Sequence, residues 1–523
     1  MRKISFITSL MMLLVFHSCK MDNEILDVNE KTREIIGESY FNDRSSNEGM
    51  IVLGAKLNDP YRYETMLRAQ NELLNERSYG YIPPLRSTYK YVRVLPVDEY
   101  YLDLIKADTN IVFFDYPLHY EIASMGTYYH DPSIADSLPT WQYCVIPSNY
   151  SFPVGVKFEL IYDLYFPPEV SDDTFYTDLE ERAFKITGNL DENYTRASSW
   201  RPSATIKAYD DVVEGYIPLH GVKVIARRFT KVKEGLTDEK GYCVVNGTFK
   251  YPVNYSIKWE RAYWDIRSGA IWQAYTDGPK IRGKWTLNID KGSKSLMFAT
   301  IHRAAYKFYY GNCLGLRRPI LSIGKTKIHY KDSYGTGVYW GNWSILGILP
   351  DIKIWGKKSD GTYKETNYVY GTTIHELGHQ SHALHIGTIN FWQNTKFIYE
   401  SWATAVEWKL TNHHYNVELA KNASCVNYNH ENGHQLWTNS AINIEYTPVF
   451  IDLIDDFNQA NVYGSDYIND EITGYSLSYI QNKILDDTYG LHSLSLSLKA
   501  NKKGNTTDSS IHNLLLKYYG HGF

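Results

Sequence analysis

Two histidines and a glutamate in the C-terminal half of the chain have the types and spacing of a metal-dependent hydrolytic centre. Residues 372–385 read TTIHELGHQSHALH, with His375 and His379 four residues apart. On a helix of 3.6 residues per turn, their imidazoles lie on one face and can bind a single ion. Glu376 lies beside them, where its carboxylate can reach a metal-bound water without occupying a coordination position. The spacing predicts Zn²⁺ as cofactor, with Glu376 as general base toward the activated water.

A catalytic zinc needs a third protein ligand, and His385 is the first candidate. It has the spacing of the HExxHxxGxxH sites of the metzincins. However, His382 stands where those sites have glycine, and all eight methionines lie at or before Met297, so no methionine turn can follow. These two departures exclude the metzincin arrangement.

Glu400 is the second candidate, in the segment FIYESWATAVEW at residues 397–408. Glu400, Ala403, Thr404 and Glu407 fall at positions 0, +3, +4 and +7, which form one face of a helix. If this helix faces the first one, Glu400 supplies an oxygen ligand and the small Ala403 lets the backbones approach. Glu407 can then accept the second N–H of a zinc histidine and fix its tautomer.

The pairing of HELGH with ESWATAVE across a 20-residue interval resembles the gluzincins, the group that contains thermolysin and the aminopeptidase-N-like enzymes. The resemblance covers about 35 residues. It implies Glu400 as third ligand, Glu407 as the acid behind the ligands, and peptide hydrolysis in a zincin domain. No GAMEN-like motif precedes the metal helix, so an endopeptidase is the default expectation.

Gluzincins also use a downstream tyrosine or histidine to stabilise the oxyanion. Several residues fit this role equally well in sequence: Tyr446, Tyr463, Tyr467, Tyr475 and His434. His382 shares the helix face of the predicted ligands, and we expect it to be a hydrogen-bonded polar side chain rather than a wall of the cleft.

The elements that must position these residues follow from the apolar pattern. We expect helices at 296–310 and 370–385, and strands at 320–330, 337–340 and 348–355. Three later segments, 447–459, 477–487 and 510–520, have helical spacing. This order of a helix, strands and a metal helix suits a zincin domain over 289–523, in which the sheet edge binds the backbone of a protein or peptide substrate.

Two further domains are expected before it, which makes the fold class multidomain α+β. Residues 58–210 are expected to form an α+β domain, with helices at 60–76 and 99–107 and strands at 89–96, 111–117, 142–146 and 156–165. Residues 211–288 carry short alternating strands separated by turn signals. Their pattern resembles the carboxypeptidase regulatory-like or transthyretin-like β-sandwich, a module that usually supports a neighbouring domain.

The N-terminus is expected to be a targeting signal rather than part of the fold. Residues 1–19 combine a basic start, a short apolar core and Ser18 directly before Cys19. They resemble a bacterial lipoprotein signal, in which Cys19 is lipidated and anchors the protein to the outer membrane. Charged residues in the following tether, 20–57, resemble those that direct lipoproteins to the cell surface. The alternative is an ordinary secretory signal with a coincidental cysteine.

Composition limits the remaining partners. A formal charge of −5 provides no basic surface for nucleic acid, and the sequence says nothing of oligomeric state. Cys144, Cys243, Cys313 and Cys425 either form two disulfides or are buried thiols. A chain with 46 tyrosines also suits a binding surface. The alternative function is therefore a lipid-anchored binding protein with an inactive zincin domain, and hydrolysis of a non-peptide amide or ester is a third.

Overall fold

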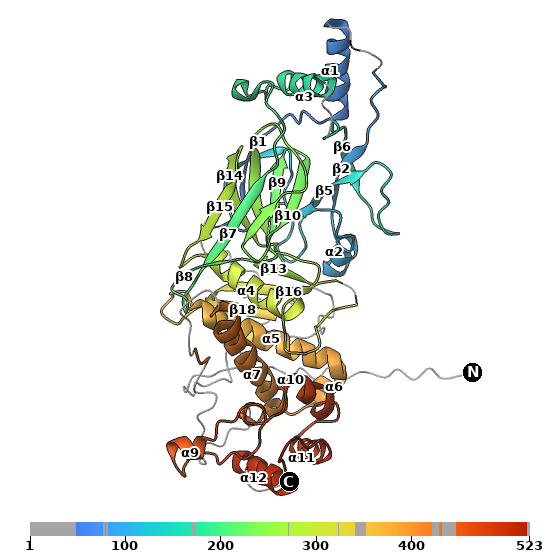
Figure 1. Cartoon of the computed structure of the whole chain (residues 1–523). Coiled ribbons are helices and arrows are strands. Elements are labelled where there is room, and N and C mark those ends of the chain that lie inside the picture. Colours follow the sequence, from blue (N-terminus) through green and yellow to red (C-terminus); the bar gives the residue numbers. More distant parts are fainter. Residues whose placement is uncertain are drawn as a thin grey trace, which may run out of the picture.

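The computed structural model describes residues 49–76, 79, 82–169, 174–269, 271–322, 324–339, 352–420, 428–430 and 446–519. The chain has a multidomain mixed α+β architecture, as predicted. Helices α1 and α3 lie at one end, the C-terminal helices lie at the other, and the sheets lie between them (Figure 1). None of the helices in these ranges is long and apolar enough to cross a membrane. The predicted signal, Cys19 and most of the tether lie outside the described residues.

The N-terminal part combines helices with a four-stranded antiparallel sheet. Its helices are α1 (Tyr63–Glu76), α2 (Glu99–Ile105) and α3 (Thr174–Ile186), and a single 3₁₀ turn spans Glu192–Tyr194. The sheet order is β3 (Phe113–Phe114), β5 (Gln142–Pro147), β2 (Tyr89–Val94) and β6 (Glu159–Leu164). The predicted helices and strands of this part are confirmed; their bounds are shorter, except that β5 extends one residue further than predicted. In addition, β1 (Val52–Lys56) pairs with β4 (Tyr120–Ser124), so the end of the expected tether is part of the fold.

Two four-stranded sheets form the middle of the molecule. One has the order β10 (Lys231–Leu236), β9 (Lys223–Arg228), β12 (Val253–Lys258) and β14 (Tyr275–Ile281). The other has β11 (Tyr242–Val244), β7 (Ser203–Asp210) and β15 (Trp285–Ile289), and β8 (Gly215–Pro218) also pairs with β7. Strand β7 alternates buried and half-buried residues, and its buried side chains join the shared core of the two sheets. It therefore belongs with this pair of sheets, although its residues precede the expected boundary at 211.

The third sheet lies next to the predicted metal helix. Its order is β13 (Trp264–Ser268), β16 (Thr326–Tyr334), β18 (Ile352–Lys357) and β17 (Gly337–Tyr339). The first three strands are parallel, and β17 is the antiparallel edge strand among the described residues. Strand β13 comes from the segment expected to form the sandwich; all five of its residues are buried, as is typical of parallel strands.

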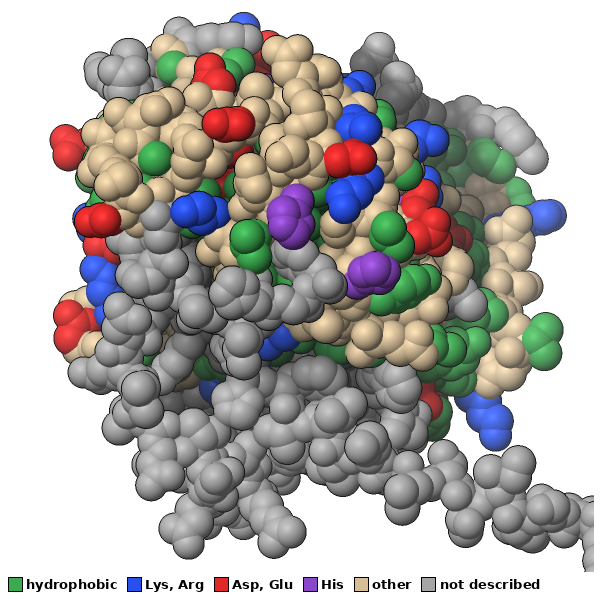
Figure 2. Space-filling model, turned by 90° about the horizontal axis from the view of Figure 1, so that it is seen from below, with side chains coloured by type: hydrophobic (Ala, Val, Ile, Leu, Met, Phe, Trp, Pro, Cys, Tyr) green, Lys and Arg blue, Asp and Glu red, His purple; other side chains and the backbone are tan. Residues whose placement is uncertain are grey.

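Helices pack around this sheet and extend to the C-terminus. Helix α4 (Lys294–Tyr309) contacts β13 and β16, and α5 (Thr366–Ile386) contacts α4, β17 and β18. The remaining helices are α6 (Thr388–Gln393), α7 (Lys396–His413), α8 (Val449–Asp452), α9 (Gln459–Tyr463), α10 (Leu477–Tyr479), α11 (Leu491–Ala500) and α12 (Asp508–Tyr519), with π-helical turns at His414–Leu419 and Ile480–Ile484. Two of the three helices expected at the C-terminus are therefore broken into shorter segments, and the last is α12, which begins two residues earlier than expected. Seen from this end, acidic and basic side chains are interspersed on the described surface (Figure 2).

The cysteines of the described chain are thiols. Cys144, Cys243 and Cys313 are free and buried, each in a different part of the fold. Burial raises the pKa of the Cys144 thiol and raises that of Cys243 to about 11. These three behave as small apolar side chains. Cys425, the fourth cysteine of the predicted body, lies outside the described residues.

A buried ion pair joins the central sheets to the helices below them. Asp210, at the end of β7, is fully buried and accepts a hydrogen bond from Arg303 of α4 at 2.8 Å and one from the Tyr415 hydroxyl at 2.9 Å. Its other oxygen accepts the backbone N–H groups of Val212 and Val213. Burial alone would raise the pKa of Asp210, but Arg303 and these hydrogen bonds hold it below its ordinary value.

Replacing Arg303 with methionine tests how strongly this ion pair holds the parts together. The change leaves a buried carboxylate without its cation, which typically costs about 3–5 kcal/mol. We expect the free energy of unfolding, measured by urea denaturation, to fall by about this amount. The control is Arg68→Met, since the Arg68–Glu72 pair is exposed and such pairs contribute about 0.5 kcal/mol or less. Equal effects of the two changes would contradict the assigned role of Arg303.

Candidate metal centre

Helices α5 and α7 approach each other closely because small residues occupy their contact. A Cβ atom placed on Gly378 would lie 3.4 Å from Val406 Cβ and 3.6 Å from the Cα atom of Ala403. A larger side chain at either position would push the helix axes apart, since interaxial distances depend on the side chains at the contact. The sequence had indicated this role for Ala403, whereas that of Gly378 emerges only in the folded protein.

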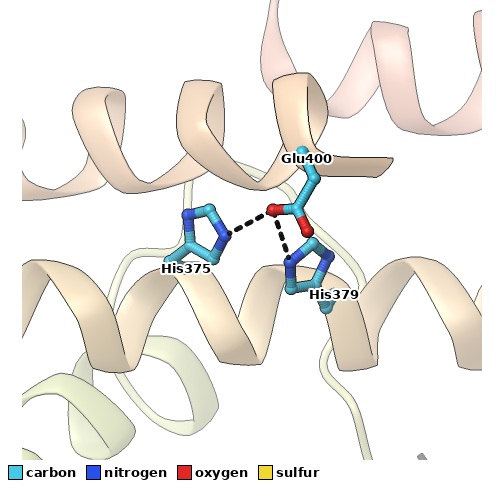
Figure 3. A group of neighbouring side chains, drawn as sticks. All are labelled: His375, His379 and Glu400. Atoms are coloured by element: carbon cyan, nitrogen blue, oxygen red, sulfur yellow. Dashed lines mark hydrogen bonds and ion pairs between the residues drawn. The ribbon is translucent and has the colours of Figure 1, made fainter. Parts of the chain in front are cut away.

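The close packing brings the two predicted histidine ligands to the predicted glutamate. Glu400 Oε2 lies 3.3 Å from Nε2 of His375 and 3.4 Å from Nε2 of His379. Both rings point from α5 toward the carboxylate on α7 (Figure 3). One ligand atom from each residue lies within 4.8 Å of the others, and all three residues are buried. A single cation between them can therefore contact two imidazole nitrogens and one carboxylate oxygen.

The protonation states of these groups suit a cation. Burial lowers the pKa of His379, which favours the neutral imidazole that binds metals. Burial alone would raise the pKa of Glu400, but His379 and His375 hold it well below its ordinary value. Two neutral imidazoles and one carboxylate are the donor set of catalytic zinc sites with an open fourth position. The residues present thus fit Zn²⁺.

Glu407 holds one of the histidines from behind, as its spacing had predicted. Its Oε2 lies 3.0 Å from His375 Nδ1, so His375 presents Nε2 to the centre. Its Oε1 lies 3.0 Å from Nε2 of His430, whose Nδ1 in turn lies 2.8 Å from the Tyr428 hydroxyl. Carboxylates in this position orient a ligand histidine and raise its basicity.

Sequence reasoning missed His430, which lies outside any regular element of the described chain. One signal was present in Gly371, four residues before His375 on α5. A Cβ atom there would lie 2.5 Å from His430 Nε2 and 2.7 Å from Glu407 Oε1. Glycine at this position leaves room for the Glu407–His430 pair against the helix.

Glu376 is a buried carboxyl with few partners. It is 1% exposed, and neither carboxylate oxygen has a side-chain hydrogen-bond partner among the described residues, although the backbone of Tyr339 lies close enough to lower its pKa. Burial raises its pKa to about 8, with the charges of Glu400 and Glu407 contributing in the same direction. A buried carboxyl without side-chain partners is unfavourable unless a bound group or water meets it. The space for this carboxylate depends on the edge strand, because a Cβ atom on Gly337 would lie 2.3 Å from Glu376 Oε1.

Aromatic rings enclose the other side of the centre. The ring centroid of His379 lies 6.3 Å from that of Tyr339 on β17, 6.0 Å from that of Phe391 and 5.7 Å from that of Tyr399. Trp392 stacks on Tyr339 at 6.4 Å. This apolar wall lowers the local dielectric and so strengthens the interactions of charges inside it.

The two other histidines of α5 lie away from the three ligand atoms. His385 pairs with Asp486 at 2.5 Å, consistent with its exclusion as a ligand. His382 is fully buried against Phe391, and neither ring nitrogen has a hydrogen-bond partner among the described residues. The expectation that His382 is hydrogen-bonded is therefore wrong within the described chain, because apolar packing surrounds its ring.

The structure gives different surroundings to the residues predicted as oxyanion donors. The Tyr475 hydroxyl accepts the Lys503 N–H at 3.1 Å, and Tyr463 packs against Tyr467 at 5.1 Å, so these three have partners within the C-terminal helical segment. Tyr446 is buried, and the next residue, Thr447, donates its N–H to the hydroxyl of Ser401, the residue that follows Glu400. His434 lies outside the described residues.

Comparison with known proteins adds no assignment to this geometry. Neither a scan against protein-family models nor a search of curated proteins finds a match for the chain.

Glu407→Gln tests the contact behind the ligands. The neutral amide cannot accept charge-assisted hydrogen bonds from the rings of His375 and His430. We therefore expect zinc affinity to fall about 10- to 100-fold, as is usual for such residues. The measurement is competition for Zn²⁺ with a calibrated chelator. The control is Glu418→Gln, which removes another histidine-bound carboxylate at His414, away from the ligands. Unchanged affinity in Glu407→Gln would refute the role of Glu407.

Gly337→Ala tests the space that the edge strand leaves for Glu376. The added methyl group must displace the carboxylate, and a misplacement of about 1 Å costs on the order of a hundredfold in rate. We expect turnover to fall by about this factor while zinc content is unchanged. Gly283→Ala is the control, since no atom of the described chain lies within 4 Å of a Cβ atom placed there. Full turnover in Gly337→Ala would show that Glu376 does not depend on this contact.

Proposed function

We propose that the protein is a zinc-dependent peptidase, with an endopeptidase as the default. The observation that supports this best is the convergence of His375, His379 and Glu400 beside the buried carboxyl of Glu376. The metal ligands would be His375, His379 and Glu400. Glu376 would be the general base, and the substrate a protein or peptide.

The chain's own groups divide the work of hydrolysis. Bound Zn²⁺ would polarise the scissile carbonyl and lower the pKa of water at the open position. Glu376 accepts the proton of the attacking water and delivers it to the leaving amine. Glu407 keeps His375 in the tautomer that presents Nε2. No covalent intermediate with the protein is required.

Strand β17 supports a peptide substrate in particular. It is the antiparallel edge strand of its sheet in the described chain and contacts the metal helix α5. An extended peptide added at such an edge gains backbone hydrogen bonds that do not depend on its sequence. The scissile carbonyl of such a peptide would then lie near Glu376, whose carboxylate lies against Gly337 of β17.

The finer assignments belong to the same proposal. The sheet with an antiparallel edge strand, together with the ligands on α5 and α7, supports a zincin domain of gluzincin type. The pair of central sheets supports a transthyretin-like module that carries it. We further propose a lipid anchor at Cys19 and a location on the bacterial outer membrane, facing the exterior, both of which rest on the sequence alone.

Glu376→Gln separates an enzyme from a metal-binding protein. The amide cannot accept the proton, so we expect cleavage of a proteome-derived peptide library to fall by at least about a hundredfold, with zinc content unchanged. The control is Glu365→Gln, a half-buried glutamate at the start of the same helix that pairs with Lys358.

Two outcomes would count against the peptidase. Cleavage at the wild-type rate by Glu376→Gln would remove the proposed base. Stoichiometric zinc in the wild-type protein without turnover of peptides or glycoproteins would instead favour the anchored binding protein.

A further inference from the structure

A cavity lies between the N-terminal part and the central sheets, and none of its lining residues belongs to α5 or α7. Its volume is about 220 Å³, which holds roughly seven waters at about 30 Å³ each, or one molecule of monosaccharide size. The floor is the sheet of β9, β12 and β14, and residues 116–122, which include the start of β4, cover it. The cavity is therefore formed where two parts of the fold meet.

The floor is unusually polar for a buried contact. Strand pairing aligns Arg227 of β9 with Asn254 of β12 and Lys280 of β14, and places Ser256 beside Asp277. All five line the cavity. Burial lowers the pKa of Lys280, and the positive charges of Arg228 and Arg227 lower it further. Several cations thus act on the same small space.

Arg228 is a buried cation in the lining of this cavity. It is 8% exposed, and its Nε has no hydrogen-bond partner among the described residues. Its guanidinium lies against the rings of Phe184 and Phe229, at 5.7 and 4.9 Å from their centroids, and no carboxylate of the described chain forms an ion pair with it. Buried arginines are normally paired, because an unpaired buried charge is strongly unfavourable.

The neighbouring arginine is held in place but keeps binding capacity. Arg227 is 4% exposed, and its Nη1 donates to the carbonyl of Leu118 at 2.8 Å. Its guanidinium has five N–H donors, so others remain for a ligand. On the floor, Asp277 accepts the Gly126 N–H with Oδ2, while its buried Oδ1 has no partner among the described residues. The lining thus includes two guanidinium groups and the Lys280 ammonium as donors, and the carboxylates of Asp277 and Glu121 as acceptors.

We propose that this cavity binds a small organic anion, with Arg228 and Arg227 receiving its oxyanion group and Asp277 accepting from a hydroxyl or ammonium group of the same molecule. Guanidinium groups match carboxylate, sulfate and phosphate geometry well. Two sources share this chemistry, an acidic sugar and a free amino acid. The site is independent of the proposed peptidase, since it uses none of the same residues.

The test is thermal unfolding of the full chain with paired probes. Glucuronate is compared with glucose, and alanine with alaninamide, so that each pair differs in the carboxylate. A ligand that binds only the folded state raises the unfolding temperature with saturation. We expect one acid to do so and its partner without the carboxylate not to, and the pair that responds identifies the source. No difference within either pair would overturn the proposal.

Arg228→Gln shows whether the effect arises in the cavity. Loss of a charge-assisted contact predicts binding about 10- to 100-fold weaker. Without ligand, the variant should unfold close to the wild-type temperature, because it loses only the contacts of the guanidinium with the Phe184 and Phe229 rings. Unchanged ligand binding by Arg228→Gln would overturn the proposal. The control is Arg201→Gln, an exposed arginine just before β7.

Asp277→Asn provides an independent variant for the second contact. It keeps the shape of the side chain but removes its charge, so the acid found above should bind more weakly while inorganic sulfate, which has no donor to offer Asp277, is unaffected. Equal binding of that acid by Asp277→Asn and wild type would remove Asp277 from the site. Because all these readouts are unfolding temperatures, their failure leaves the peptidase proposal untouched, and the reverse is also true.

Discussion

The close contact of α5 with α7 is the constraint on which the candidate centre depends. Two imidazoles and a carboxylate can share one ion only if helices far apart in sequence hold their side chains within a few ångströms. Gly378 and Ala403 permit this approach because neither places bulk between the backbones. The buried charge of Glu400 is acceptable only beside the two rings, since a lone buried carboxylate would be strongly unfavourable.

The elements around this contact fix the orientation or position of individual side chains of the centre. Glu407 and His430 fix the orientation of His375, and Gly371 leaves the space that this pair needs. Strand β17 limits Glu376 on the opposite side. Farther away, Asp210 and Arg303 tie the central sheets to α4, which packs against α5. The rigid β-structure thus supports the metal helix through a short series of packed elements.

Several buried charged groups in the described chain depart from the usual rule that buried polar atoms find partners. Glu376 and Arg228 are two of them, one beside the candidate metal ligands and the other in the cavity between the N-terminal part and the central sheets. Both lie where a bound group would supply the missing contact. Asp210, by contrast, is buried and accepts five hydrogen bonds.

The sequence by itself determined the local parts of this protein. Helical periodicity predicted α4, α5 and α7, and the four-residue spacing of His375 and His379 was sufficient to place both rings on one face, because these features depend on neighbours along the chain. Tertiary structure alone decided the rest. Strand β7 precedes the expected sandwich but joins its sheets, and β13 lies within the expected sandwich but joins the sheet next to α5. Both outcomes depend on pairing with distant strands. His430 reaches Glu407 from outside any regular element, and Arg228 and Asp277 line the same cavity, because three-dimensional packing sets which distant residues become neighbours.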